Sequence, residues 1–185
     1  MPANFELKAR CADLPRARER ARAIATSWLG EDQQVDTYFE TAAGAARSEA
    51  HVRAAARPGR LKLRESSLSG AQLVAYLRPD APLARRSDYV VIPLPEPERT
   101  KQLLAELLGV RRVVRKLREI GLFENVRIHL DRVEGLGDFV ELEAVWDGDG
   151  AGEAEQVRKV AFLRERLAIR DADLIAASYE GLLGP

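Results

Sequence analysis

Strict alternation of charged and apolar residues limits the fold of this chain more than any other feature. From Asn4 to Arg10, polar residues hold every second position and apolar residues the positions between them. Successive side chains of a strand point to opposite faces, so this period of two predicts a strand with one charged face. Further strands are predicted at residues 34–39, 60–64, 71–78, 88–94, 113–122, 125–133 and 138–145.

Helices are expected between and after these strands. Apolar residues recur at three- and four-residue spacings over residues 13–29, 98–108, 153–168 and 171–183. Residues 41–59 are rich in Ala, Arg and Gly, which predicts a long loop or a short exposed helix. Strands of a buried parallel sheet would be continuously apolar, so the charged alternation favours an antiparallel α+β fold.

Several strands place charges of the same sign two positions apart on one face, as in Lys62 and Arg64. Such side chains lie about 6.5–7 Å apart and repel each other. A charged strand face is usually a solvated one, which would carry mixed residues with opposite charges paired across strands. The same-sign pairs favour a closed or nearly closed barrel instead, with a charged interior and helices packed outside.

A multivalent anion would relieve the repulsion inside such a barrel. Holding an ion away from water costs several kcal/mol, whereas a triphosphate offers about four negative charges and many acceptor oxygens that suit Arg. Carboxylates beside a phosphate become useful if they hold Mg²⁺ or Mn²⁺, which prefer oxygen ligands. Glu141, Glu143 and Glu6 are the natural candidates.

Composition excludes several other classes of protein. The 29 basic and 29 acidic residues give no net charge, which argues against a nucleic-acid-coating or membrane-surface protein. One cysteine and two histidines cannot build a structural zinc site. No apolar run approaches the ~20 residues that span a bilayer, and the first residues lack the apolar stretch of a signal peptide. We therefore expect a cytoplasmic protein of one domain, residues 1–185.

Several segments, in order along the chain, resemble the CYTH family of class IV adenylyl cyclases, thiamine triphosphatases and inorganic triphosphatases, also called triphosphate tunnel metalloenzymes. The family hallmark is Glu-x-Glu-x-Lys on the first strand, and this chain has Asn-Phe-Glu-Leu-Lys at 4–8. Further matches are GRLKLRE at 59–65, YLRPD at 76–80, Lys-x-Arg at 116–118, residues 125–145 and SYEGLL at 178–183. Residues 125–145 are most like the cyclase branch.

The resemblance implies an eight-stranded antiparallel tunnel that binds a triphosphate and a divalent metal, Mg²⁺ or Mn²⁺. The basic residues that it implies as triphosphate-binding are Lys8, Arg10, Lys62, Arg64, Arg78, Lys116, Arg118 and Arg127. The acidic residues that it implies as metal ligands are Glu6 and Glu141, with Asp131 and Glu143 as further ligands. Lys8 and Arg118 would stabilise developing charge, and Asp131 or a metal-bound water would be the general base.

Two departures from the family pattern stand out. Asn4 replaces a carboxylate, so a second metal would bind weakly or not at all, and a loop insertion is expected at about 42–58. Three kinds of function stay open: a cyclase, a triphosphatase, and a non-catalytic module that binds nucleotide or polyphosphate. A nucleic-acid-binding domain built on the basic run at 111–118 is disfavoured, because aromatic residues are only 6% of the chain.

Three further points stay open in the sequence. His129 is expected either to contact phosphate or to hydrogen-bond Asp131. No separate adenine pocket can be recognised, so neither the preferred triphosphate nor the preferred metal follows from the residues. The oligomeric state, monomer or homodimer, is equally open.

Overall fold

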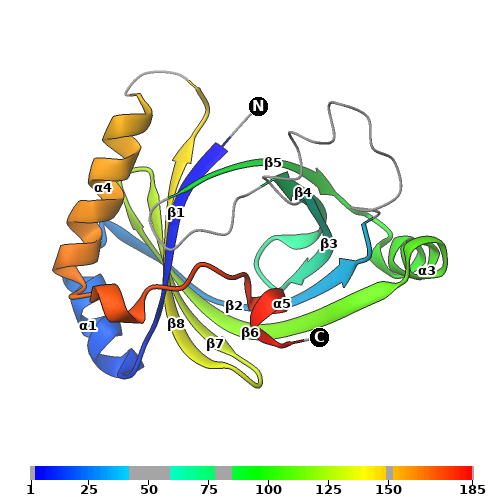
Figure 1. Ribbon diagram of the computed structural model, residues 1–185, viewed down its shortest axis with the longest axis horizontal. Coiled ribbons are helices and arrows are strands. Elements are labelled where there is room, and N and C mark those ends of the chain that lie inside the picture. The colour runs from blue at the N-terminus through cyan, green and yellow to red at the C-terminus, as the bar shows by residue number, and fades with distance from the viewer. Residues whose placement is uncertain (1–2, 42–58, 78–84, 149–151, 185) are drawn as a thin grey trace.

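The computed structural model describes residues 3–41, 59–77, 85–148 and 152–184. Within these residues eight antiparallel strands close into a barrel in the order β1-β5-β4-β3-β2-β6-β7-β8 (Figure 1). The strands are β1 Ala3–Arg10, β2 Ser27–Phe39, β3 Gly59–Ser66, β4 Gly70–Leu77, β5 Arg85–Pro93, β6 Val110–Phe123, β7 Val126–Val133 and β8 Gly137–Trp146. The predicted α+β barrel is therefore confirmed. The expected insertion at 42–58 lies outside the described residues.

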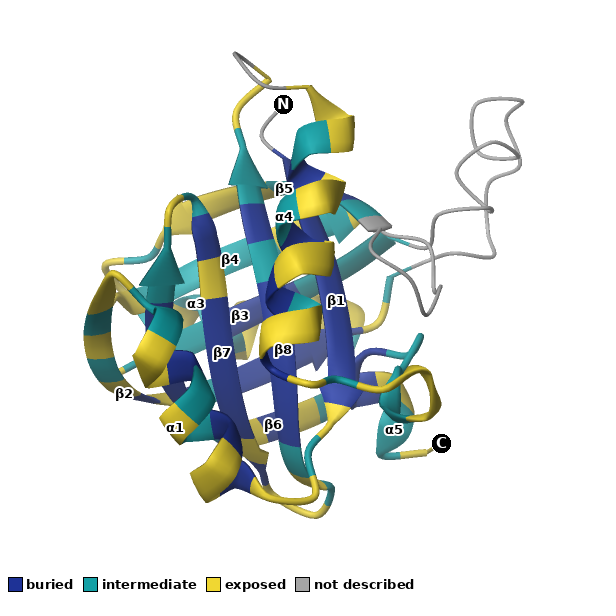
Figure 2. Cartoon of the chain, turned by 90° about the vertical axis from the view of Figure 1, so that its left-hand side faces the viewer, coloured by how far each residue is buried: buried dark blue, intermediate teal, exposed yellow. Residues whose placement is uncertain are grey.

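The helices lie outside the barrel. They are α1 Leu14–Ile24, α3 Pro97–Leu108, α4 Glu153–Arg166 and α5 Tyr179–Leu182, with a 3₁₀ turn, η1, at Asp171–Asp173. Figure 2 shows α1 and α4 lying over β1, β7 and β8, whose residues are mostly buried. Among the described residues, no helix is both long and apolar enough to span a lipid bilayer.

The main hydrophobic core lies between the barrel and these two helices, not inside the barrel. The outward side chains of β1, β7 and β8, such as Phe5, Ile128 and Leu142, pack against Leu14 of α1 and Leu163 of α4. All five are at most 4% exposed. Burial of the apolar strand faces on the outside leaves the alternate, charged faces to line the interior.

The first predicted helix is wrong at its end. Helix α1 stops at Ile24, and β2 already begins at Ser27, so Trp28 lies on a strand. The Trp28 ring covers Gly121 of β6, where an added Cβ would lie 2.8 Å from the ring. Trp28 follows Ile24 at helical spacing, which is why the sequence pattern extended the helix too far.

The last predicted helix, residues 171–183, is also wrong. Only η1 and the four-residue α5 are helical, and the chain between them is extended. The backbone N–H of Ile175 donates to the carbonyl of Lys8 at 2.9 Å, and Leu174 forms a β-bridge with Ala9. These backbone groups pair with β1 instead of within a helix, and this places α5 at one end of the barrel.

Candidate active site

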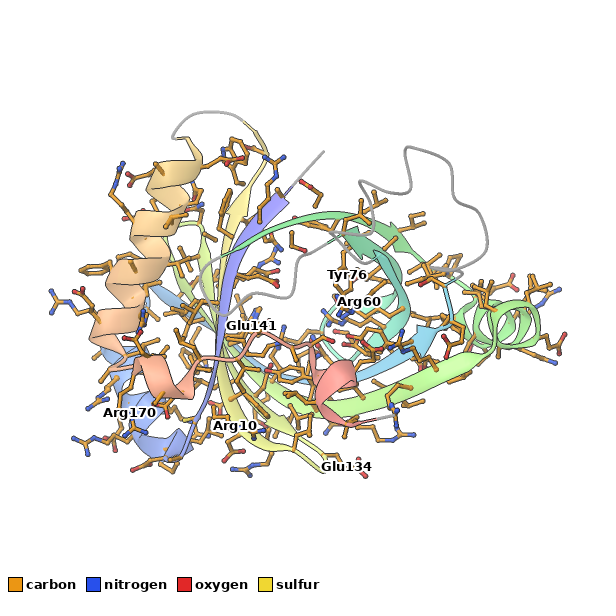
Figure 3. All side chains as sticks on the ribbon, in the orientation of Figure 1. Arg10, Arg60, Tyr76, Glu134, Glu141 and Arg170 are labelled. Atoms are coloured by element: carbon orange, nitrogen blue, oxygen red, sulfur yellow. The ribbon has the colours of Figure 1, made fainter. Side chains whose placement is uncertain are left out.

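The inward faces of the barrel enclose a cavity of about 560 Å³, lined by side chains from every strand and by Ser178 and Tyr179. Nine of the predicted site residues line it: Glu6, Lys8, Lys62, Arg64, Lys116, Arg118, Arg127, Glu141 and Glu143. They come from β1, β3, β6, β7 and β8, because each strand presents alternate residues to the interior. Figure 3 shows Glu141, Arg60 and Tyr76 around this opening.

On one side of the cavity, three basic side chains donate hydrogen bonds to the same buried carboxylate. Asp36 of β2, 1% exposed, accepts from Lys62 Nζ at 2.9 Å and from Lys116 Nζ at 3.0 Å. Arg64 donates to both oxygens of Asp36, through Nε at 2.7 Å and Nη2 at 2.8 Å. We call these four residues the basic wall. Its bases outnumber its carboxylate, so it favours an anion in the cavity.

Burial and charge oppose each other in the basic wall. Burial disfavours ionised Asp36, but the charges of Arg64, Lys116 and Lys62 outweigh it and hold the pKa of Asp36 well below its usual range. Burial lowers the pKa of Lys116 to about 8, although Asp36 opposes the change. Burial likewise lowers the pKa of Lys62 well below its ordinary value. A bound anion would favour the protonated form of both lysines.

The opposite side of the cavity carries more carboxylates than bases. Glu6 and Glu143 are direct partners across β1 and β8, and Lys8 faces Glu141 in the same register. Lys8 Nζ lies 3.3 Å from Glu141 Oε1, and Arg127 Nη1 donates to Glu143 Oε2 at 3.1 Å. We call these five residues the acidic wall.

Arg118 stands on β6, the strand that also carries Lys116 of the basic wall, and it bonds to Glu141 of the acidic wall. Its guanidinium donates to Asp131 through Nε at 2.6 Å and Nη2 at 2.5 Å, and to Glu141 Oε2 at 2.6 Å. The Tyr179 hydroxyl also donates to Asp131, at 2.6 Å. Lys8 Nζ lies 3.8 Å from the centre of the Tyr179 ring, a cation–π contact. Tyr179 therefore contacts Lys8 directly and is linked to Arg118 through Asp131.

A metal ion would find suitable atoms on the acidic wall but no preformed site. Among the described residues, no three His, Cys, Asp or Glu side chains are grouped as they would be around a metal. Glu141 is instead held by Lys8 and Arg118, and Asn4 donates to Glu143. The oxygen donors of Glu6, Glu141 and Glu143 nevertheless fit Mg²⁺ or Mn²⁺. These oxygen atoms therefore suit the metal, but Lys8 and Arg118 would first have to release Glu141.

Four predicted residues need a separate account. Asp131 is 0% exposed and its oxygens accept hydrogen bonds from Arg118 and Tyr179, so it orients Arg118, and its role as metal ligand or general base stays a prediction. Arg10 is exposed and its guanidinium lies over the Phe139 ring, because it is the last residue of β1 and stands at the end of the barrel. Arg78 lies outside the described residues. His129 faces Glu141, with Nδ1 3.6 Å from Oε2, instead of Asp131.

Sequence reasoning missed Asp36 and gave Tyr179 no role in the site. Asp36 stands in an alternating run, Asp32, Gln34, Asp36 and Tyr38, whose members all line the cavity. Extending the period-two argument to this run would have placed Asp36 inside. Tyr179 falls in the run 171–183, whose apolar spacing predicted a helix, so the pattern gave no reason to place its side chain in the cavity. Only the family match of SYEGLL at 178–183 pointed to this segment.

Comparisons with known proteins agree with this geometry. The family model that matches is the CYTH domain, over residues 3–179. A structure from Pyrococcus horikoshii OT3 has 22% identity, a TM-score of 0.75, and covers 97% of this chain and 98% of its own. A proposed adenylate cyclase from Vibrio parahaemolyticus has 21% identity, a TM-score of 0.74, and covers 98% of each chain.

A third similar structure and one negative result complete the comparison. A proposed adenylyl cyclase from Hippeastrum, described as having a dominant triphosphatase activity, has 18% identity and a TM-score of 0.57, with 98% of this chain and 94% of its own covered. No match was found among curated proteins. At these identities the solved structures support the fold, and the family model supports membership.

Proposed function

Since the chain belongs to the CYTH domain family, whose members generally act on triphosphates, we propose that it is a metal-dependent enzyme that processes a triphosphate inside the barrel. The observation that carries this proposal is the basic wall. Lys62, Arg64 and Lys116 share Asp36 and face a cavity wide enough for a ligand. A polyphosphate offers this cluster several negative charges and acceptor oxygens at once.

The bases of the cavity would divide the work. Lys62, Arg64 and Lys116 would bind phosphate oxygens from one side, and Arg127 would contribute at the rim, where its side chain is 46% exposed. Lys8 and Arg118 would stabilise negative charge that develops during the reaction, since both line the cavity beside the candidate metal ligand Glu141. Asp131 and Tyr179 would hold Arg118 in orientation. Arg78, outside the described residues, stays a predicted phosphate contact.

Glu6, Glu141 and Glu143 would hold the divalent metal, Mg²⁺ or Mn²⁺. Such an ion supplies positive charge to phosphate oxygens without a proton transfer. Lys8 and Arg118 now neutralise Glu141, and binding of a triphosphate would draw these bases toward phosphate. The carboxylate they leave would then be available for the cation.

Two reactions suit such a site. In a cyclase the ribose 3′-hydroxyl of ATP attacks the α-phosphorus and pyrophosphate leaves, whereas in a triphosphatase water attacks the terminal phosphorus. Both depend on positioning and charge stabilisation. Similar structures carry both descriptions, one as a proposed adenylate cyclase and one with dominant triphosphatase activity.

A specific observation favours a second candidate, a module that binds nucleotide or polyphosphate without turnover. Asn4 stands where the family has a carboxylate, and its amide donates to Glu143, a candidate metal ligand. This bond occupies an oxygen that a metal would need. A chain that binds triphosphates but cannot hold the metal would match this arrangement.

One assay separates these candidates. The purified protein is incubated with Mg²⁺ or Mn²⁺ and, separately, with ATP, thiamine triphosphate and inorganic triphosphate. Cyclic AMP with pyrophosphate identifies a cyclase, and orthophosphate identifies a triphosphatase. Binding without product would support the non-catalytic module. The absence of both binding and product would refute the proposed function.

The substitution Glu141→Ala tests the metal role. We expect metal-dependent turnover to fall by about 100-fold or more, on the scale of losing one main electrostatic group of an active site. Leu107→Ala on α3, whose side chain is 70% exposed, is the matched control and should keep activity. Unchanged turnover by a folded Glu141→Ala protein would refute the assignment of Glu141 as ligand.

A further inference from the structure

His129 lies inside the barrel, between two candidate metal ligands. It stands on β7, lines the cavity and is only 3% exposed. Its direct partner on β8 is Glu141, and Glu143 follows two positions later on the same inward face. The imidazole Nδ1 lies 3.6 Å from Glu141 Oε2, and Nε2 lies 4.0 Å from Glu143 Oε2. The ring therefore faces two of the three carboxylates to which we assign the metal.

The Nδ1 atom of this ring is buried and has no hydrogen-bond partner among the described residues. Its 3.6 Å separation from Glu141 exceeds the range of about 2.7–3.2 Å for a hydrogen bond. The same carboxylate oxygen already accepts from Arg118 at 2.6 Å. Buried polar atoms almost always have a partner, so an isolated one inside a cavity indicates a group that binds beside it.

A cation suits this position better than a phosphate. A phosphate oxygen at Nδ1 would lie beside Glu141 and Glu143, whose negative charges repel it, whereas both carboxylates attract a metal ion. Atoms that bind one divalent metal lie ~2.0–2.2 Å from it, and therefore about 3–4 Å from each other. The 3.6 Å between Nδ1 and Glu141 Oε2 falls within this range.

A nitrogen ligand changes which metal a site prefers. Mg²⁺ is a hard cation that prefers oxygen ligands, so a site of carboxylates and phosphate oxygens suits it well. Imidazole nitrogen suits first-row transition metals, and the affinity of nitrogen and oxygen ligands for these ions rises from Mn²⁺ to Co²⁺. One imidazole beside the carboxylates would therefore move the preference away from Mg²⁺.

We propose that His129 is a nitrogen ligand of the divalent metal, beside Glu141, and that it makes the site prefer a first-row transition ion to Mg²⁺. This inference rests on the proposed function, because Lys8 and Arg118 must release Glu141 when a triphosphate binds. Among the described residues no metal-binding group is preformed, so metal and anion are expected to bind together.

Pulsed electron paramagnetic resonance of bound Mn²⁺ tests the assignment without turnover. The anion is an inorganic triphosphate analogue with methylene groups in place of both bridging oxygens, which can be neither hydrolysed nor cyclised. The protein carries no histidine tag, and its histidines are labelled with ¹⁵N. We expect echo modulation from a bound ¹⁵N that disappears in His129→Gln. It should persist in His51→Gln, which changes the only other histidine of the sequence and is the matched control.

The outcomes separate this inference from the proposed function. Mn²⁺ that binds with the analogue but shows no histidine nitrogen would overturn the inference and leave the proposed function standing. Binding of the analogue without Mn²⁺ would also overturn it and would support the non-catalytic module. If neither Mn²⁺ nor the analogue binds the unchanged chain, the proposed function itself is refuted.

Calorimetry with Co²⁺ and Mg²⁺ measures the preference, in the presence of the analogue and with metal binding by free analogue subtracted. His129→Gln replaces the nitrogen ligand by an amide oxygen, so the ratio of Co²⁺ to Mg²⁺ affinity should fall about tenfold or more. The affinity for the analogue in EDTA should stay the same. An unchanged metal ratio would contradict the proposal, and a weaker affinity for the analogue in EDTA would then assign His129 to phosphate binding.

Discussion

The basic and acidic walls of the cavity arise from the same alternating pattern, but their charges are balanced differently. On the basic wall three bases share Asp36, which is 1% exposed. On the acidic wall three carboxylates, Glu6, Glu141 and Glu143, stand with Lys8 and Arg127. Alternation places charge inside a barrel, whereas the local ratio of bases to acids decides whether a wall attracts anions or cations.

The two walls also differ in how far their charges depend on one residue. The ion pairs of the basic wall all converge on Asp36, while those of the acidic wall are distributed over several carboxylates. Arg127 on the acidic wall is 46% exposed, so water can replace part of its pairing. Removal of a single carboxylate should therefore cost the basic wall far more.

Asp36→Ala should give the largest effect. It leaves Lys62, Arg64 and Lys116 buried without their shared partner, and we expect it to lower the free energy of unfolding by ~3–5 kcal/mol. Urea denaturation followed by circular dichroism measures this loss. Glu143→Ala is the control from the acidic wall and should cost much less. Similar losses in the two variants would show that the walls do not differ as described.

Inorganic triphosphate sharpens the same test, because it can replace the missing negative charge. Ligand that binds only the folded state raises its stability by mass action. We therefore expect millimolar triphosphate to raise the free energy of unfolding of Asp36→Ala by more than that of the unchanged chain. A smaller gain in the variant would argue that the anion does not lie on the basic wall.

Lys116→Ala should give the next largest effect, on binding and not on folding. Loss of a charge-assisted hydrogen bond to phosphate should weaken triphosphate affinity ~10–100-fold. The affinity for inorganic monophosphate should fall less, because one phosphate cannot contact all three bases together. Calorimetry measures both, with Lys101→Ala, on a surface pair with Glu65, as control. Equal losses for the two anions would contradict a wall that grips several phosphates.

How much of this comparison the sequence could predict depends on the kind of interaction. Period-two alternation placed nine site residues in the cavity correctly, since it follows from strand geometry alone. The pairing of Asp36 with bases from β3 and β6 depends on strand order, which alternation does not specify. The ring of Trp28 over Gly121 and the docking of α5 are tertiary contacts that override local pattern.

Tyr179→Phe tests the junction between the walls and should have a moderate effect. The variant loses the hydroxyl that donates to Asp131 and keeps the ring beneath Lys8. With Arg118 less firmly oriented, kcat should fall about threefold to tenfold, the range for one net hydrogen bond, while KM changes little. Steady-state kinetics on the substrate found by the assay above provide the measurement. Tyr179→Leu, which also removes the ring, should lower kcat further; an unchanged kcat in Tyr179→Phe would show that the hydroxyl does not act through Asp131.

The smallest expected effect is a pH dependence that separates the walls. Burial lowers the pKa of Lys116 from 10.5 to about 8, so below pH 8 the folded protein keeps this lysine charged and anion binding is strongest. As pH rises from 7 to 8, loss of the proton from about half of the molecules should weaken triphosphate binding about twofold. Folding shows the opposite sign: the unfolded chain holds this proton up to a higher pH, so Lys116 adds stability as pH rises from about 8 toward 10.5.

Calorimetry in buffers of different ionisation enthalpy measures the proton taken up when triphosphate binds at pH 8. Lys62, whose pKa burial also lowers, would change affinity in the same direction. Lys116→Arg keeps its charge throughout this range and should flatten the pH profile. A profile that stays as steep in Lys116→Arg would assign the titration to another group, and the charge of the basic wall would then not depend on Lys116.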